Sequence, residues 1–433
     1  MLFGIRALFF AYSVVMEAIV WLVLVPTTWL RTRTRATRDA GAWREHLARV
    51  PSGPTAGDAG AVLIHAVSVG EMHAVAPLVA ALSAQSRRIV LTSGTAAGLD
   101  AARRLAQTHS AIVGIGWLPW DRRAVHAWLS ARAPSCVVVV ETELWPNLFR
   151  ACADLDIPLV IVNGRVRPRD VPRYRWGRAF FRHVLACATW IGVQSDAERE
   201  RFVAIGAPRD RVVVAGNLKF DAALMAATTA PSTAAGAGPT PLVVAGSTHA
   251  PEERWLLECA RQLAERGLPV RLVLAPRHIT RAEEIVRVAS ARGMRVFRGA
   301  DDSADDWDVL VVDTYGTLNT WYAAADVVVM GGTFVPVGGH NILEPAALGR
   351  PIVVGPHTEE IASLLTVFDE AGAIMRVTSA DRPRGLADAC ASLLTDRANA
   401  RIHGARAFAA CQRGSGAAAR YAAAIAEQID ARS

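Results

Sequence analysis

Polar residues that could do chemistry follow the apolar runs of this sequence, at the points where buried strands are expected to end. In parallel α/β proteins the loops after the strands hold ligands and catalytic groups. Carboxylates at such positions can accept protons, and arginines suit phosphate groups because their donors are planar and fixed. The candidates in the first half of the chain are Ser68, Glu71, Glu141, Glu143, Asn163, Arg165 and Arg167.

The stretch "VSVGEMHA" places Glu71 just after a predicted strand and a glycine turn, where a helix begins. The N–H groups at a helix start attract anions, and the helix dipole favours an ionised carboxylate there. We therefore expect Glu71 to be deprotonated at neutral pH and able to accept a proton. The residues alone leave an alternative open, in which Glu71 only stabilises the start of the helix by about 0.3–1 kcal/mol.

In the second half, the glycine-rich stretch "GGTFVPVGGHN" precedes the helical pattern "ILEPAALG". Glycines allow backbone N–H groups to approach a phosphate closely, and the following helix adds the positive end of its dipole. Arg277 and His278 follow the apolar run "LVLAP", where a phosphate would lie, and Glu344 could accept hydrogen bonds from a ribose. A tight turn, a surface arginine and an ordinary loop histidine are the alternatives.

Short runs rich in valine and isoleucine alternate with helical patterns and would place these residues at strand ends. The runs "AVLIHAVS", "CVVVVETE" and "PLVIVNG" are unbroken, as expected of strands buried on both faces. The alternation predicts an α/β fold with parallel sheets. It stops at residues 222–240, which are rich in alanine, threonine, glycine and proline, and restarts at residue 241. We therefore predict a linker at 222–240 between two Rossmann-like domains, at residues 31–221 and 241–433, that face a central cleft.

Residues 7–30 hold a single charged residue, Glu17, and are long enough to cross a bilayer. Four arginines follow within residues 31–38, so the positive-inside rule places the body of the protein in the cytoplasm. We expect a membrane anchor over residues 1–30, as a helix that spans the membrane or lies in its surface.

The net charge of +7 suits an anionic membrane surface, a phosphorylated lipid or a nucleic acid as partner. Nucleic acid is the weakest of the three, because the chain has no zinc-finger spacing, aromatic RNA-binding signature or long basic run. The six cysteines are far apart and form no CxxC pair, which is typical of reduced thiols in a protein core.

Six motifs, in this order and spacing, resemble those of the 3-deoxy-D-manno-oct-2-ulosonic acid (Kdo) transferases, membrane-associated glycosyltransferases that attach Kdo to the lipid A precursor. They are "HAVSVGE", "VETELWPN", "NGRVR", "AGSTH", "LAPRH" and "GGTFVPVGGHNILEPAALGRPIVVGPHT". The resemblance covers nearly the whole chain, and "ETELWPN" together with "GGHNILEPAALG" carries most of its specificity. Gly164 departs from the alanine that the family commonly has in its "NAR" motif.

The resemblance implies a GT-B type glycosyltransferase with the donor CMP-Kdo and an acceptor hydroxyl on an acylated, phosphorylated lipid A precursor, in lipopolysaccharide biosynthesis. It implies inversion at the anomeric carbon without a metal ion or other cofactor. The expected location is the cytoplasmic face of the inner membrane. Glu71 matches the glutamate that serves as the base in the family.

The resemblance also divides the other candidate residues between donor and acceptor. We assign the phosphate of CMP to Arg277, His278 and the loop that contains Gly338, Gly339 and His340. Asn341 and Glu344 would then lie on the ribose and cytidine side. The remaining candidates, which would bind the acceptor or the donor sugar, are Ser68, Glu141, Glu143, Asn163, Arg165 and Arg167.

Two other functions stay open at this point. The first is another two-domain glycosyltransferase or an epimerase that uses a UDP-sugar, because such enzymes have the same two-domain architecture. The second is a catalytically silent membrane adaptor, which would leave the polar residues at the strand ends unexplained.

Overall fold

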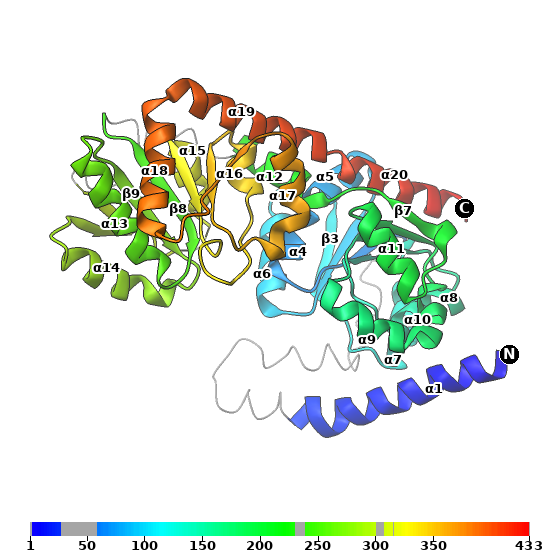
Figure 1. Cartoon of the computed structure of the whole chain (residues 1–433). Coiled ribbons are helices and arrows are strands. Elements are labelled where there is room, and N and C mark those ends of the chain that lie inside the picture. Colours follow the sequence, from blue (N-terminus) through cyan, green and yellow to red (C-terminus); the bar gives the residue numbers. More distant parts are fainter. Residues whose placement is uncertain (1, 27–58, 230–238, 300–306, 315, 433) are drawn as a thin grey trace. The chain divides into compact units, whose positions relative to one another are not determined.

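The computed structural model describes residues 2–26, 59–229, 239–299, 307–314 and 316–432 (Figure 1). The chain forms two compact units. The first contains residues 1–222 and 415–433, and the second contains residues 223–414.

The first unit is built on a parallel sheet of seven strands in the order β3-β2-β1-β4-β5-β6-β7. Alternate residues of each central strand lie in two different apolar clusters. Ile64 and Val138 belong to one cluster and Leu63 and Val137 to the other, so both faces of the sheet are buried. This is why the strands read as unbroken apolar runs. The strands are β1 (Val62–His65), β2 (Ile89–Ser93), β3 (Ile112–Trp117), β4 (Cys136–Val140), β5 (Leu159–Gly164), β6 (Trp190–Val193) and β7 (Val212–Val214).

Helices connect these strands and cover the two faces of the sheet (Figure 1). They are α4 (Val69–Ala74), α5 (Ala76–Ala84), α6 (Ala96–Ala106), α7 (Ala124–Arg132), α8 (Pro146–Asp154), α9 (Val171–Trp176), α10 (Arg178–Leu185) and α11 (Asp196–Ile205), followed by α12 (Leu218–Thr229). The start of the predicted linker, residues 222–229, therefore continues a helix. Residues 230–238 of that linker lie outside the described residues.

The second unit repeats the architecture with a parallel seven-stranded sheet in the order β10-β11-β9-β8-β12-β13-β14. Its strands are β8 (Leu242–Thr248), β9 (Arg271–Pro276), β10 (Val296–Arg298), β11 (Val309–Val311), β12 (Val327–Met330), β13 (Ile352–Val354) and β14 (Ile374–Arg376). Its helices are α13 (Glu252–Glu265), α14 (Ala282–Ser290), α15 (Leu318–Ala324), α16 (Leu343–Ala347), α17 (Ala362–Glu370), α18 (Arg382–Thr395) and α19 (Arg397–Gly414). Both sheets thus confirm the predicted pair of Rossmann-like domains. The cleft predicted between them stays a prediction.

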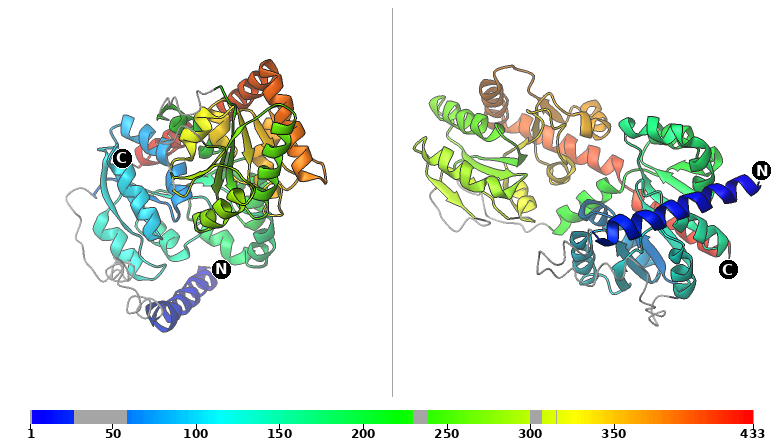
Figure 2. Two further views of the ribbon diagram at one scale, coloured as in Figure 1. Left: turned by 90° about the vertical axis from the view of Figure 1, so that its left-hand side faces the viewer. Right: turned by 90° about the horizontal axis from the view of Figure 1, so that it is seen from below.

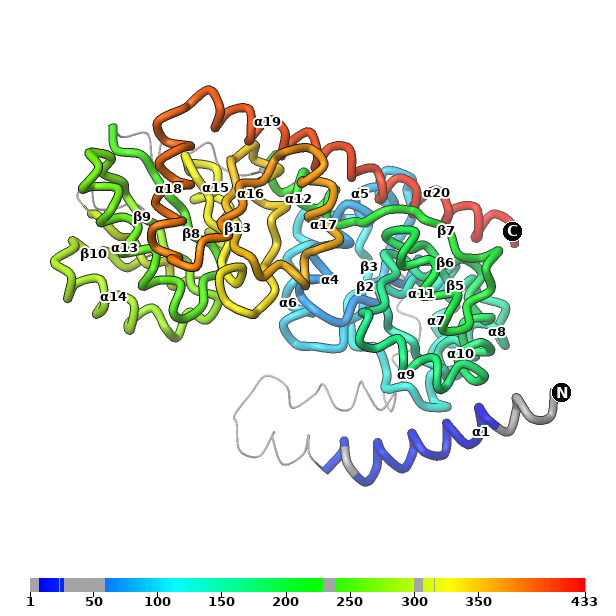
Figure 3. The backbone as a smooth tube through the Cα atoms, viewed as in Figure 1, coloured from blue at the N-terminus to red at the C-terminus, as the bar shows by residue number. Residues whose placement is uncertain are grey.

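The last helix, α20 (Ala417–Asp430), packs on the first unit (Figure 3). Tyr421 and Ile425 lie in the same apolar cluster as β1 and β4, and the Tyr421 hydroxyl donates to the Gly216 carbonyl at 2.9 Å. The carboxylate of Asp221 accepts the backbone N–H groups of Gly416 and Ala417, at 2.9 and 3.2 Å. The second compact unit therefore ends at residue 414, whereas the sequence placed the end of the second domain at residue 433.

The N-terminal helix α1 (Leu2–Ile19) continues through a π-helical turn, Val20–Leu24, and lies along α8 and α10 of the first unit (Figure 2). Its polar side chains face the protein. The Tyr12 hydroxyl donates to Asp121 at 2.7 Å, Ser13 donates to the Asn147 side chain at 2.6 Å, and Glu17 pairs with Arg122 at 2.7 Å. The exposed apolar side chains of this segment include Leu8, Phe10, Val14, Val15, Ile19, Trp21 and Leu22.

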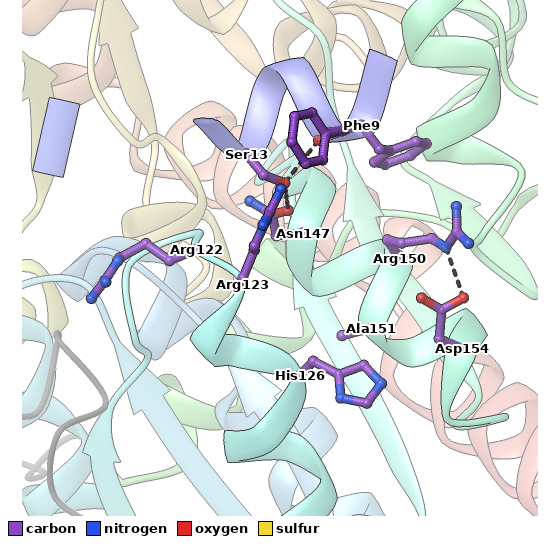
Figure 4. A pocket seen from close by; sticks show the side chains of 10 residues that line it. Phe9, Ser13, Arg122, Arg123, His126, Asn147, Arg150, Ala151 and Asp154 are labelled. Carbon is purple, nitrogen blue, oxygen red and sulfur yellow. Dashed lines mark hydrogen bonds and ion pairs between the residues drawn. The ribbon is translucent and has the colours of Figure 1, made fainter. Parts of the chain in front are cut away.

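Where α1 crosses α7 and α8, the three helices enclose an open pocket of 270 Å³ with Phe9 and Arg150 in its wall (Figure 4). Among the described residues, no helix combines the length and the apolar character needed to cross a membrane. The predicted spanning anchor is thus not confirmed. The arginines expected to follow it, within residues 31–38, lie outside the described residues.

The contact between Asp221 and α20 gives a test of the C-terminal boundary. We expect Asp221→Ala to lower the free energy of unfolding by about 1–2 kcal/mol, because three N–H groups at the start of α20 lose their acceptor. Urea unfolding measures the change. Asp430→Ala is the control, since the pair between Asp430 and Arg87 is exposed and contributes little. Equal effects of the two substitutions would contradict the role of Asp221.

Candidate active site

The first candidate site lies where the strand order of the first sheet reverses, between β1 and β4. Ligands of doubly wound folds bind at this switch point, beyond the carboxyl ends of the two strands. The loop after β1 carries Ser68 and Glu71, and the loop after β4 carries Glu141 and Glu143. The structure therefore brings these four predicted residues to one edge of the sheet.

Glu71 is the third residue of α4 and forms a capping box with Ser68. The Ser68 hydroxyl accepts the backbone N–H of Glu71 at 3.2 Å and donates to Glu71 Oε1 at 3.1 Å. The backbone N–H of Val67 donates to Glu71 Oε2 at 2.7 Å. The spacing Ser-x-x-Glu is the sequence signature of this motif, and our reading of the sequence missed it. Because the partner of Oε1 is a hydroxyl that can rotate, Oε1 can still accept a proton from a substrate.

The pKa of Glu71 is raised to about 7. Burial is the largest cause, and the neighbouring carboxylates of Glu141 and Glu143 raise the pKa further, whereas the N–H of Val67 and the hydroxyl of Ser68 lower it. The prediction that the helix dipole keeps Glu71 ionised at neutral pH is therefore wrong. Helix α4 has only six residues, and burial with two nearby negative charges outweighs its dipole.

Glu141 ends β4 with a left-handed backbone (φ 59°), which turns its side chain away from the strand direction. Its carboxylate lies 3.2 Å from the ammonium group of Lys219, at the start of α12. Lys219 is the one lysine among 47 lysine and arginine residues. This rarity is visible in the sequence, but the place of Lys219 beside a candidate carboxylate is not. A lysine there supplies a compact point charge on a flexible stem, unlike the planar fork of arginine.

Asn163 holds Lys219 in this place. The Asn163 side chain is fully buried, and its oxygen accepts the backbone N–H of Leu218 at 3.0 Å. Asn163 also has a left-handed backbone (φ 56°) at the end of β5. This placement favours a role in fixing the start of α12 over the predicted direct contact with an acceptor.

The loop after β4 is also tied to α1. Glu143 accepts the indole N–H of Trp145 at 2.9 Å. Two residues on, the backbone N–H of Asn147 donates to Asp121 at 3.1 Å, and Asn147 accepts from Ser13 of α1. Burial raises the pKa of Asp121 to about 6, although the Tyr12 hydroxyl and the N–H groups of α8 stabilise its charge. Asp121 and Ser13 were not predicted, because their partners are far away in the sequence.

The predicted acceptor arginines lie on the loop after β5, one strand further from the switch point. Glu198 fixes this loop by accepting the backbone N–H of Val166 at 2.8 Å. Arg167 is exposed and pairs with Asp170 at 3.0 Å, and Arg165 is half-buried. The structure does not bring the two arginines into contact with Glu71, and their role in acceptor binding stays a prediction.

The second candidate site lies at the switch point of the second sheet, between β8 and β12. Here the carboxylate of Glu252 joins the two loops. It accepts the backbone N–H groups of His249, Gly332 and Phe334, at 2.8, 2.9 and 3.0 Å. Glu252 is buried, and burial raises its pKa while the three donors lower it. Sequence reasoning missed Glu252, although the spacing His-x-x-Glu at a helix start resembles a capping box.

More backbone amides of the glycine-rich loop are bonded within the protein than predicted. The amides of Gly332 and Phe334 serve Glu252, and that of Gly339 donates to the Gly332 carbonyl at 2.9 Å. Gly332 has a left-handed backbone (φ 70°), and a side chain there would meet the His340 ring at 2.9 Å. Gly338 has φ 97°, with Glu360 against it. The loop needs these glycines for its backbone shape and packing, and the amides named here are not available to a phosphate.

Three histidines and an arginine gather at this edge. His249 and His340 are joined by a contact of 2.8 Å between their Nε2 atoms, and the His278 ring lies edge-on to His249 with centroids 5.7 Å apart. Arg277 is exposed, and its backbone N–H donates to the Thr248 carbonyl at 3.0 Å. Burial, with the neighbouring cationic groups, lowers the pKa of His340 to about 4. The same causes lower the pKa of His249. His249, which ends the motif "AGSTH", was not among the predicted site residues.

Asn341 and Glu344 continue the site along α16. Asn341 accepts the backbone N–H of Leu343 and donates to Glu344, both at 3.1 Å. Burial raises the pKa of Glu344. The structure thus brings together all the predicted donor residues at one edge of the second sheet. In the part of the chain that the structure describes, no group of three or more His, Cys, Asp or Glu residues is arranged to hold a metal ion.

Known proteins resemble this chain in sequence over most of its length. A family model described as "3-Deoxy-D-manno-octulosonic-acid transferase (kdotransferase)" matches residues 41–222. The 3-deoxy-D-manno-octulosonic acid transferase of Bordetella pertussis is 34% identical over 411 residues, which cover 90% of this chain and 94% of the relative. The transferase of the same name from Haemophilus influenzae is 29% identical over 327 residues, 73% of this chain and 76% of the relative.

Solved structures share the fold. The UDP-GlcNAc 2-epimerase of Neisseria meningitidis, bound to UDP-GlcNAc, superposes with a TM-score of 0.59 at 15% identity, over 86% of this chain and all of the epimerase. At this identity the similarity shows the fold alone. It confirms the predicted GT-B type architecture of two parallel-sheet domains.

The raised pKa of Glu71 predicts a stability change with pH. The folded protein holds the Glu71 proton more tightly than the unfolded chain, so stability falls as the pH rises from about 4.5 to about 7 and stays lower above. We expect Glu71→Gln to raise the unfolding temperature relative to the unsubstituted protein at pH 8 and much less at pH 5. Calorimetry at both values measures this. Glu359→Gln, at an exposed site, is the control. An equal effect of Glu71→Gln at both pH values would contradict the raised pKa.

Proposed function

Because the chain belongs to the family of 3-deoxy-D-manno-octulosonic acid (Kdo) transferases and is therefore a glycosyltransferase, we propose that it transfers Kdo from CMP-Kdo to a hydroxyl of an acylated, phosphorylated lipid A precursor. We propose further that the transfer inverts the anomeric carbon and needs no metal ion. The observation that carries the proposal is Glu71, a half-buried carboxylate at a switch point with a pKa of about 7. A general base works best when its pKa lies near the working pH.

In the proposed reaction, Glu71 takes the proton of the acceptor hydroxyl while the hydroxyl oxygen bonds to the anomeric carbon of Kdo. The bond from that carbon to the phosphate oxygen breaks on the opposite face, and its electron pair leaves with CMP. Attack opposite the leaving group inverts the configuration. Oε1 of Glu71 suits this role because its partner, the Ser68 hydroxyl, can turn towards another acceptor.

The donor would bind at the edge of the second sheet. Arg277 is exposed there, and no described residue forms an ion pair with its guanidinium, so it is available to the phosphate of CMP. Asn341 and Glu344 offer an amide and a carboxylate to the ribose and cytosine. Fixed cationic and hydrogen-bonding groups can stabilise the charge of a leaving phosphate. They would do so here in place of a divalent ion.

The acceptor and the location at the cytoplasmic face of the inner membrane form the second part of the proposal. The exposed apolar side chains of α1 and the π-helical turn after it, among them Leu8, Phe10 and Leu22, suit contact with acyl chains. The exposed arginines Arg167 and Arg169 suit the phosphates of the acceptor. In the sequence, four arginines follow the apolar segment and support the cytoplasmic orientation.

Substitution of the proposed base tests the reaction. We expect Glu71→Gln to lower the turnover number by at least about 100-fold, the usual contribution of a general base, while the affinity for CMP stays within about threefold. Mass spectrometry of the lipid product and calorimetry with CMP provide the two measurements. Glu359→Gln is the matched control. Near-normal turnover of Glu71→Gln would sink the assignment, and tighter binding of UDP than of CMP would reject the donor.

The ion pair between Lys219 and Glu141 predicts a shift of the pH profile. Lys219→Met leaves the Glu141 charge uncompensated, so the pKa of Glu71 rises and the acidic limb of kcat/KM moves to higher pH. Lys219→Arg keeps the charge and is expected to keep the limb. Initial rates between pH 5.5 and 9 decide this. If the acidic limb of kcat/KM in Lys219→Met stays at the same pH while activity is lost at all pH values, the lysine has a structural role instead.

A further inference from the structure

His249 and His340 form a hydrogen-bonded pair that the reaction outlined above does not use. Their Nε2 atoms are 2.8 Å apart, and the planes of the two rings differ by 8°. A contact of this length between two imidazole nitrogens needs one proton between them, because two bare nitrogens or two N–H groups would repel each other. The pair therefore holds one proton between its Nε2 atoms.

The surrounding structure fixes the distance between the two rings. Glu252 accepts the backbone N–H of His249 and, with its same oxygen, that of Gly332. The His340 ring lies against Gly332, where a side chain would displace it. One buried carboxylate thus holds together the backbones of the two loops that carry the histidines.

Charged and titratable groups of both signs surround the pair. Arg277 and His278 follow β9, and Arg281 lies in the turn before α14. On α13, Glu252 accepts backbone N–H groups, and Glu253 pairs with Arg281 at 2.8 Å. Glu360 lies against Gly338 of the same glycine-rich loop. Burial is the main reason that the pair stays neutral in the free protein, and the nearby arginines and the other histidines add to it.

In the neutral pair, one Nδ1 is a donor and the other is an acceptor. One ring uses its Nε2–H in the shared bond, so its Nδ1 is an acceptor, and the other ring carries a proton on Nδ1. One added proton converts the remaining acceptor into a donor and gives the pair a positive charge. The protonated pair then carries an N–H donor on each Nδ1, and a charged donor binds an anionic oxygen more strongly than a neutral one.

We propose that His249 and His340 form a proton-linked phosphate site, in which a bound nucleoside phosphate draws one proton from solvent into the histidine pair. The negative phosphate offsets the repulsion from Arg277, His278 and Arg281, so that the second proton becomes favourable. This inference rests on the proposed function, because it places the phosphate of the donor at this edge. It adds His249 to the site and assigns the pair a charge that exists only in the complex.

The proton also acts on the leaving group. When the bond between the anomeric carbon and the phosphate oxygen breaks, the electron pair stays on that oxygen and the phosphate of CMP gains a negative charge. The positive pair stabilises this charge without giving up its proton. The positive charge of the pair is therefore present while the donor or CMP is bound, and it is lost to solvent when CMP dissociates.

Proton uptake on binding tests the site directly. The probe is the methyl ester of cytidine 5′-monophosphate, a phosphodiester that does not itself titrate near neutral pH. We measure its binding enthalpy at pH 6.5 in buffers of different ionisation enthalpy. We expect an uptake of about 0.5–1 proton per bound ligand by the full-length protein. An uptake near zero overturns the proposal.

Substitutions of individual histidines show which residues take up the proton. We expect His249→Asn and His340→Asn to bind the probe about tenfold more weakly, with an uptake near zero and an affinity that no longer changes between pH 6 and 8. His357→Asn, at a half-exposed histidine outside the pair, should keep the uptake. Loss of the uptake in His278→Asn, with the pair variants unchanged, overturns the assignment. Circular dichroism checks that each variant is folded.

A different nucleotide preference separates this inference from the proposed function. If the protein binds the uridine ester and not the cytidine ester, the proposed donor is wrong. The proton uptake measured with the uridine ester then tests the histidine pair. An uptake that disappears in His249→Asn supports the proposed proton-linked site, and an uptake near zero rejects it.

Discussion

Buried and half-buried carboxylates that accept backbone N–H groups hold the loops at the carboxyl ends of both sheets. Glu252 accepts two such bonds from the glycine-rich loop and one from His249 in the loop after β8, and Glu71 fixes the turn after β1. Glu198 and Asp121 do the same for the loops after β5 and β4. A buried carboxylate without donors would be costly. Each of these loops therefore keeps the one shape that satisfies its acid, and the side chains that it carries keep their places.

The two sites differ in the sign of their charge. In the first unit, Glu71, Glu141 and Glu143 are close enough to raise the pKa of Glu71, and Lys219 compensates only part of the charge. In the second unit, burial and the nearby Arg277 disfavour a positive charge on two histidines. In each unit, the surroundings thus disfavour the ionised form of the titratable group. An excess of negative charge favours a proton on the base, and an excess of positive charge favours an anionic ligand.

The fold could be predicted because its information is local. Each of the runs that became β1, β4 and β5 is buried on both faces, and the apolar pattern shows this directly. The domain boundary at the C-terminal end could not be predicted, because it depends on a contact between Asp221 and Gly416, which are distant in sequence. The candidate residues at the strand ends were found for the same local reason as the strands.

The electrostatic state of the site could not be predicted in this way. The helix start at Glu71 is visible in the sequence, but its burial and its neighbours Glu141 and Glu143 are not, and these reverse the direction of the pKa shift. Similarly, "GGTFVPVGGHN" shows that glycines are present but not that Glu252 takes their amides. His249 and His340 are separated by many residues, and only the pairing of β8 with β12 makes them neighbours.

The place of α20 has a consequence for biosynthesis. Tyr421 and Ile425 complete the apolar cluster that contains β1, β4 and α5. A ribosome makes these residues after the whole second unit. The core of the first unit therefore stays incomplete until the second unit has been synthesised.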